Sequence, residues 1–174
     1  MRITAKLSIA GSLFILLNTL SAQSTRPVPT TAQSVRAHFQ SVNRKVLNMV
    51  KDFPDDKYAF RLKPEMRTFG ELIVHIASGN VYAAKAGRGE KVSWDELDPK
   101  SYPNKAAVVA LMEKSIADAD ATLKGVSDEA LAKNAEPWLG VMEHSAEHYG
   151  LLVGYYRANG LVPPESRPRG SSGN

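Results

Sequence analysis

Two histidines four residues apart are the feature of this chain most suited to chemistry. His144 and His148 occupy a stretch with helical patterning. At that spacing two side chains share one face of a helix, with β-carbons about 5–6 Å apart, so both rings can reach one metal ion. A third histidine, His75, lies in another apolar stretch of helical character. The pattern predicts a metal site formed by His75, His144 and His148.

Three neutral imidazoles would give such a site the character of a catalytic centre. They leave the full charge on a divalent ion and a coordination position open for water or substrate. Such an ion can lower the pKa of a water from about 15.7 to about 7, or polarise a carbonyl or a thiol. The chain has no cysteine, so nitrogen and oxygen atoms must supply the ligands. Zinc, nickel and ferrous iron all accept imidazole, and the ligands alone do not choose among them.

A hydrogen-bonded network in the core is the alternative explanation for the three histidines. The inward stripe of the last predicted helix contains Val141, Leu151 and Tyr155 together with His144 and His148. A buried imidazole has a donor and usually an acceptor to satisfy. Three such rings need several polar partners at once, or one cation that uses all three. The metal interpretation is therefore favoured, with the polar network as its competitor.

Three glutamates near the histidines could orient an imidazole or act as a base. Glu71 is better explained by a capping box with Thr68 at the start of a helix. Glu143 and Glu147 fall on the flank of the last helix, where solvation explains them better. No catalytic residue is therefore predicted.

Two tyrosines and the first helix's histidine complete the residues considered for the site. Tyr82 and Tyr155 follow His75 and His148 by seven residues and could wall a pocket or donate a hydrogen bond. Packing within a bundle is the commoner role for such side chains. His38 is predicted to lie at the surface or at the boundary of the core, not to act as a fourth ligand.

Four amphipathic helices are predicted to position these residues. Apolar side chains recur every three or four positions in four stretches, at residues 31 to about 53, 68 to about 86, 104–125 and about 138–159. No strand-like alternation competes with them. The predicted fold is all-α, a four-helix bundle.

The ends of the predicted helices carry recognisable caps. Asn104 caps the third helix and Ser127 a short extra piece, while Gly160 is the expected left-handed terminator of the last helix. Residues 87–103 form a long connection between the second and third helices, with one short turn predicted at 94–97.

The first 22 residues resemble a secretory signal. Arg2 and Lys6 precede an apolar stretch, and small residues end at Ala22. Cleavage is predicted after Ala22, with Ser21 as the alternative. An uncleaved anchor is a further alternative, but an apolar middle of about eleven residues is short of the roughly 20 that span a bilayer. We therefore expect an exported protein, periplasmic or secreted, with no stable membrane span after cleavage.

The rest of the chain is sufficient for one domain. We predict a linker at 23–30, the bundle at 31–168 and a disordered tail at 169–174. The net charge of +4 arises from basic residues that are largely interleaved with acidic ones. Without an alternation of aromatic and basic residues, this charge does not indicate a nucleic-acid partner.

Three motifs together resemble those of the DinB-like family of four-helix bundles. They are RTFGELIVHIA at 67–77, EHSAEHYG at 143–150 and YRANGLVPP at 156–164. The resemblance covers about residues 32–168. In that family an upstream histidine and a later pair form a metal triad, which implies His75, His144 and His148 as ligands here.

The resemblance also implies a divalent ion, most often zinc or nickel with iron as a further candidate, and frequently a homodimer. Some characterised relatives are thiol-dependent transferases or isomerases, in which the ion activates a small thiol such as mycothiol or bacillithiol. Such thiols are chiefly cytosolic, so hydrolysis stands beside thiol transfer as the expected reaction, on an unknown small-molecule substrate. A non-catalytic metal-binding or ligand-binding bundle is the second hypothesis, and a structural interaction protein with a histidine network is the third.

Overall fold

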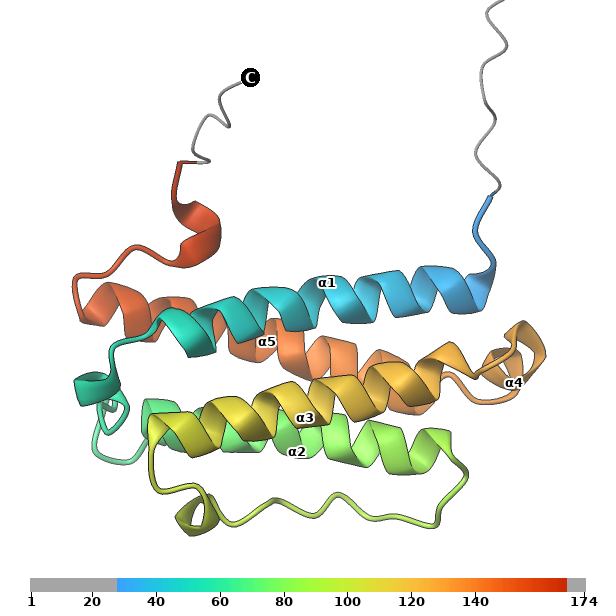
Figure 1. Ribbon diagram of the computed structural model, residues 1–174, viewed down its shortest axis with the longest axis horizontal. Helices are drawn as coiled ribbons and strands as arrows, with labels where there is room; N and C mark the ends of the chain where they lie inside the picture. Colours follow the sequence, from blue (N-terminus) through green and yellow to red (C-terminus); the bar gives the residue numbers. More distant parts are fainter. Residues whose placement is uncertain (1–27, 169–174) are drawn as a thin grey trace, which may run out of the picture.

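The computed structural model of the chain describes residues 28–168, shown in colour in Figure 1. This part contains five α-helices, three short 3-10 turns and no strand. The predicted signal peptide (1–22), most of the predicted linker (23–30) and the predicted tail (169–174) lie outside the described residues. The all-α prediction is confirmed.

Four long helices and one short one make up the fold. Their bounds are α1 (Thr31–Asp52), α2 (Phe69–Gly87), α3 (Lys105–Lys124), α4 (Asp128–Lys133) and α5 (Glu136–Ala158). The 3-10 turns are η1 (Asp55–Lys57), η2 (Pro99–Ser101) and η3 (Pro164–Ser166). Within residues 28–168, no helix is both long and apolar enough for a membrane crossing.

The four long helices form a bundle in which α1 and α2 occupy opposite corners. Each of these two helices packs against both α3 and α5. In Figure 1, α2 and α3 run in the same direction, and the chain returns along the outside of the bundle between them. This return segment, residues 88–104, is called the connection below. The long connection predicted between the second and third helices is therefore confirmed.

Local caps explain where the helices begin and end. The backbone N–H of Glu71 donates to Thr68 Oγ1 at 3.1 Å, and the backbone N–H of Thr68 donates to Glu71 Oε2 at 2.7 Å. The predicted capping box at the start of α2 is thus present. Asn104 caps α3 as predicted, and Gly160 after α5 has a φ of 69°, which favours glycine.

The short turn in the connection is not where the sequence predicted it. The prediction placed a turn at 94–97, whereas the structure has η2 at Pro99–Ser101. Asp98 caps that turn and Pro99 supplies the fixed φ of its first position. The backbone N–H of Leu97 donates instead to Ser78 Oγ on α2, at 3.0 Å. The segment before Asp98 is therefore extended along the bundle.

The buried core has two parts. One is rich in aromatic rings and is called the aromatic end below; its rings are Phe53, Tyr58, Phe69, Tyr155 and Tyr156. There the rings of Phe53 and Phe69 stack with centroids 3.8 Å apart. The other part surrounds the edge-to-face pair of Phe39 and Trp138.

Candidate metal centre

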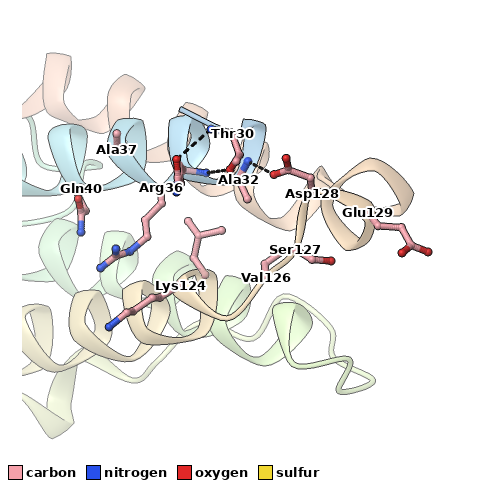
Figure 2. Close-up of a pocket in the computed structure, with 12 residues that line it drawn as sticks. Thr30, Ala32, Arg36, Ala37, Gln40, Lys124, Val126, Ser127, Asp128 and Glu129 are labelled. Carbon is pink, nitrogen blue, oxygen red and sulfur yellow. Dashed lines mark hydrogen bonds between the residues drawn. The ribbon is translucent and has the colours of Figure 1, made fainter. Parts of the chain in front are cut away.

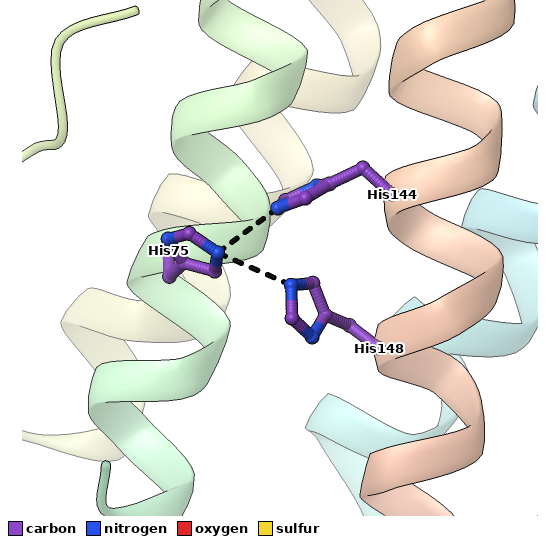
Figure 3. A group of neighbouring side chains, drawn as sticks. All are labelled: His75, His144 and His148. Atoms are coloured by element: carbon purple, nitrogen blue, oxygen red, sulfur yellow. Dashed lines mark hydrogen bonds between the residues drawn. The ribbon is translucent and has the colours of Figure 1, made fainter. Parts of the chain in front are cut away.

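The structure brings the three predicted histidines together on facing helices. His75 projects from α2, and His144 and His148 project from successive turns of α5, with all three rings directed at one another (Figure 3). His75 Nε2 lies 3.0 Å from His144 Nε2 and 3.1 Å from His148 Nε2. Within residues 28–168 they are the one group of histidine, cysteine or acidic side chains close enough together to hold a metal ion.

The number of ring nitrogens that meet, more than their separations, favours a shared ion over a hydrogen-bonded network. Histidine nitrogens bind zinc at about 2.0–2.1 Å, so two of them on one tetrahedral ion lie about 3.3 Å apart. In a network, a ring nitrogen offers one hydrogen or one lone pair. His75 Nε2 faces two neighbours at hydrogen-bond distance and can serve only one of them well. An ion would take one lone pair from each ring.

The three rings are held in the uncharged form, which a metal ion requires. Burial lowers the pKa of His144 to about 3, and the neighbouring His148 and His75 add to this effect. Burial is also the main reason that the pKa of His75 and that of His148 are lowered from the usual 6.5. At neutral pH each ring therefore keeps one nitrogen lone pair free of a proton, as a metal ligand must.

The connection supplies a carboxylate that fixes the ring of His75. His75 Nδ1 lies 3.2 Å from Glu96 Oε1, which leaves Nε2 pointing at the other two histidines. Arg67 holds the same carboxylate, with Nη2 at 3.0 and 3.1 Å from its two oxygens. Metal-bound histidines typically donate their second ring N–H to such a group. Glu96 was not among the residues predicted from the sequence, since no motif surrounds it in the connection.

On its Nδ1 side, His144 is held by packing instead of a hydrogen bond. Its Nδ1 is buried and has no partner within the described chain. A β-carbon at Gly79 would lie 3.0 Å from that nitrogen and 2.9 Å from the tip of Trp94. Trp94, from the connection, packs edge-on to His144 with ring centroids 5.0 Å apart. The absence of a side chain at Gly79 therefore lets both rings approach α2.

The glutamates considered as bases lie away from the ring nitrogens. Glu71 caps α2 and lies 3.6 Å from Arg61. Glu143 and Glu147 are exposed on α5, as their flank position indicated. His38 is exposed on α1, which agrees with its predicted surface position.

The two tyrosines have different roles. The hydroxyl of Tyr155 donates to the backbone carbonyl of Arg67, so its polar end is occupied by structure. Tyr82 packs against Trp94, with ring centroids 5.4 Å apart, and lines a cavity beside His144. Only Tyr82 is therefore a pocket wall of the kind the sequence analysis considered.

Two cavities differ in size and in chemistry. The smaller, of about 360 Å³, is lined by His144 and Trp94. The larger, of about 700 Å³, lies between α1 and the segment joining α3 to α4 (Figure 2). Two of its charged groups are engaged, because Asp128 accepts from the N–H of Ala32 at 2.8 Å and Arg36 pairs with Asp120. It also lies away from the three histidines, none of which lines it. The smaller cavity is therefore the better candidate for a functional pocket.

Comparison with known protein families matches residues 38–155, more than half of the chain, to the DinB superfamily. The chain belongs to the DinB superfamily. A search of curated proteins gave no match. All three histidines lie within the DinB region, and their arrangement is compatible with metal binding.

Proposed function

We propose that this DinB protein binds one divalent metal ion through His75, His144 and His148 and acts as a metal-dependent enzyme outside the cytoplasm. The observation that carries the proposal is the position of His75 Nε2, 3.0 and 3.1 Å from the Nε2 atoms of the other two rings. Three unprotonated nitrogens that face one point form a ligand set with a further coordination position available. Zinc and nickel are the favoured ions, and iron is a third candidate.

The reaction classes follow from what such an ion supplies and from what surrounds it. A divalent ion there would polarise a water or a small thiol, which supports hydrolysis or thiol-dependent transfer. Glu96 keeps His75 in one orientation, and Trp94 covers one side of His144. The adjoining cavity would place a small substrate next to His144. These residues bind, orient and exclude water, which is the protein's part in both reactions.

A non-catalytic metal-binding bundle is the second candidate, and one observation favours it. Among the described residues, Glu96 is the carboxylate within hydrogen-bond distance of a ring nitrogen of the cluster. It is already engaged by His75 and Arg67. A general base must be free to accept a proton from the reacting group. Turnover separates the two candidates, because both require the ion.

Metal content tests whether the protein binds an ion, which both candidate functions require. The mature protein, purified without a histidine tag, should contain close to one ion per chain by elemental analysis. The control is the triple variant His75→Ala, His144→Ala, His148→Ala, which should contain none. No metal in the mature protein after incubation with zinc, nickel or ferrous iron would leave the histidine network as the explanation.

Export and oligomeric state need separate measurements. The proposed export rests on residues 1–22, so the mass of the protein recovered outside the cytoplasm should correspond to a chain that starts at Gln23. A full-length cytoplasmic product would contradict it. The proposed homodimer is tested by sedimentation of the mature protein, in which a monomer at all concentrations would remove it.

A further inference from the structure

The cavity beside His144 has the size and lining of a small-molecule pocket. It measures about 360 Å³ and lies between α2, the connection and the first turns of α5. Pockets for small ligands begin at about 300 Å³ and combine apolar walls with a few polar groups. The lining residues are mainly apolar or aromatic, with few polar groups: Tyr82, Val92, Ser93, Trp94, Glu136, Gly140, Val141 and His144.

Two aromatic rings form one wall of this pocket. The rings of Tyr82 and Trp94 lie 5.4 Å apart between centroids, inclined at 47°. Trp94 remains 44% exposed although it is a large apolar side chain. Trp94 also lies beside His144 and His75, with ring centroids 5.0 and 6.2 Å away, so the wall continues to the proposed metal ligands. The wall therefore offers aromatic surface to a ligand that lies close to the histidines.

Glu136 gives the pocket its charge. It is the one aspartate, glutamate, lysine or arginine among the lining residues. Between residues 28 and 168, no hydrogen bond or ion pair engages its carboxylate. Its Oε1 lies 3.5 Å from the place where a β-carbon of Gly140 would stand. The carboxylate thus lies next to Gly140, and a side chain longer than alanine at residue 140 would enter the space beside it.

The helix dipole explains part of this arrangement. A carboxylate in the first turn of α5 is favoured by the positive N-terminal end of the helix. Glu136 is exposed, so the dipole and solvation explain its charge without a ligand. They do not account for two aromatic rings that line the same cavity. An acidic group beside aromatic faces is the combination that binds organic cations.

We infer that this pocket binds a small molecule with an aromatic or apolar body and an ammonium group. The body lies on Tyr82 and Trp94, and the ammonium group pairs with Glu136. The opposite end of the molecule then lies at His144, where the proposed ion would act on it. This last step rests on the proposed function, whereas the binding preference does not.

Three probes of similar shape and different charge test the preference on the metal-free mature protein. They are benzylammonium, benzyl alcohol and benzoate, and the readout is the NMR signal of the Trp94 indole N–H during titration. We expect benzylammonium to bind about five- to tenfold more tightly than benzyl alcohol, the factor that one cation–aromatic and carboxylate contact at a partly exposed site provides. Benzoate should bind most weakly. Equal affinities for all three, or no shift of the Trp94 signal, would overturn the inference.

Two variants identify the residues responsible. Glu136→Gln should remove the advantage of benzylammonium and leave the affinity for benzyl alcohol unchanged. Trp94→Leu should weaken both, read from backbone amide signals near the pocket. The matched control is Glu129→Gln, since Glu129 is exposed on α4 and does not line this pocket. An unchanged preference in Glu136→Gln would contradict the role of that carboxylate.

The metal measurement separates this inference from the proposed function. The titrations use protein without metal, so a protein that binds benzylammonium but never takes up an ion supports the pocket and removes the enzyme proposal. A protein that contains one ion per chain but binds the three probes equally well would support the proposed metal site and overturn the inference about the pocket.

Discussion

Two groups of polar side chains, the tyrosine hydroxyls of the aromatic end and the rings of the histidine cluster, are satisfied in different ways. At the aromatic end, each buried hydroxyl donates to a backbone carbonyl: Tyr58 to Val50, Tyr155 to Arg67 and Tyr156 to Met49. At the histidine cluster, three ring nitrogens face one another.

The difference separates polar groups that serve the fold from polar groups that remain available. A buried hydroxyl with a carbonyl acceptor needs nothing further. The three uncharged rings do, because His75 Nε2 faces two neighbours and can form a good hydrogen bond with only one of them. The aromatic end is therefore expected to govern stability, and the histidine cluster to govern binding.

The largest expected effect comes from removing a ring at the aromatic end. Phe69 is fully buried and stacks on Phe53. Phe69→Ala should lower the free energy of unfolding by about 3–5 kcal/mol, because it removes apolar contacts and leaves a cavity. Chemical denaturation measures this. Phe69→Leu, which removes less volume, should cost less. Both variants should still take up one metal ion per chain while folded. Loss of the ion from folded Phe69→Leu would contradict the assignment of stability to the aromatic end and binding to the histidine cluster.

The complementary change removes one histidine. Zinc at a hundred times its dissociation constant should stabilise the wild-type protein by about 2.7 kcal/mol. For a chain of this size the melting temperature should then rise by roughly 5–10 °C. His144→Ala should lose this rise. The control is Tyr156→Phe, which removes a hydroxyl at the aromatic end and should retain it. An equal rise in His144→Ala would place the ion elsewhere.

Glu96 tests whether the connection helps to hold the proposed ion. Glu96→Gln keeps the size of the side chain and removes the charge that accepts from His75 Nδ1. Loss of such a partner typically weakens metal binding about 10–100-fold. Competition with a chelator measures this affinity, and the visible spectrum of the cobalt-substituted protein reports the ligand geometry. The control is Glu90→Gln, since Glu90 lies on the same connection and pairs with Arg88. An equal affinity in both variants would limit Glu96 to holding Arg67.

Some of this arrangement could be predicted from the sequence because it depends on local rules. Thr68 and Glu71 predict where α2 begins, and the four-residue spacing of His144 and His148 places both on one face of α5. Their alignment with His75 followed from helical periodicity and from the family resemblance. The pairing of His75 with Glu96 could not be predicted, because the two residues are 21 positions apart and the chain between them includes an extended segment with no repeat that fixes its register. The turn predicted at 94–97 was wrong for the same reason.

The smallest expected effect concerns Gly79, where the fold and the site compete for the same space. Replacing a helical glycine with alanine usually stabilises a protein by about 1 kcal/mol. At Gly79 the new β-carbon would lie 2.9 Å from Trp94 and 3.0 Å from His144 Nδ1. Trp94 can move with the connection, whereas the ring of His144 is confined between α2 and α5. Gly79→Ala should therefore gain less stability than expected and should bind zinc a few-fold more weakly.

Gly150 provides the matched comparison for that substitution. It lies on α5, and a β-carbon there would meet nothing within 4 Å. Gly150→Ala should show the full gain in stability by chemical denaturation, with unchanged zinc affinity by competition with a chelator. If Gly79→Ala matched it in both measurements, the close approach of His144 to α2 would not be needed for binding. The site would then tolerate a shift of that ring, and the packing around His144 would serve the fold alone.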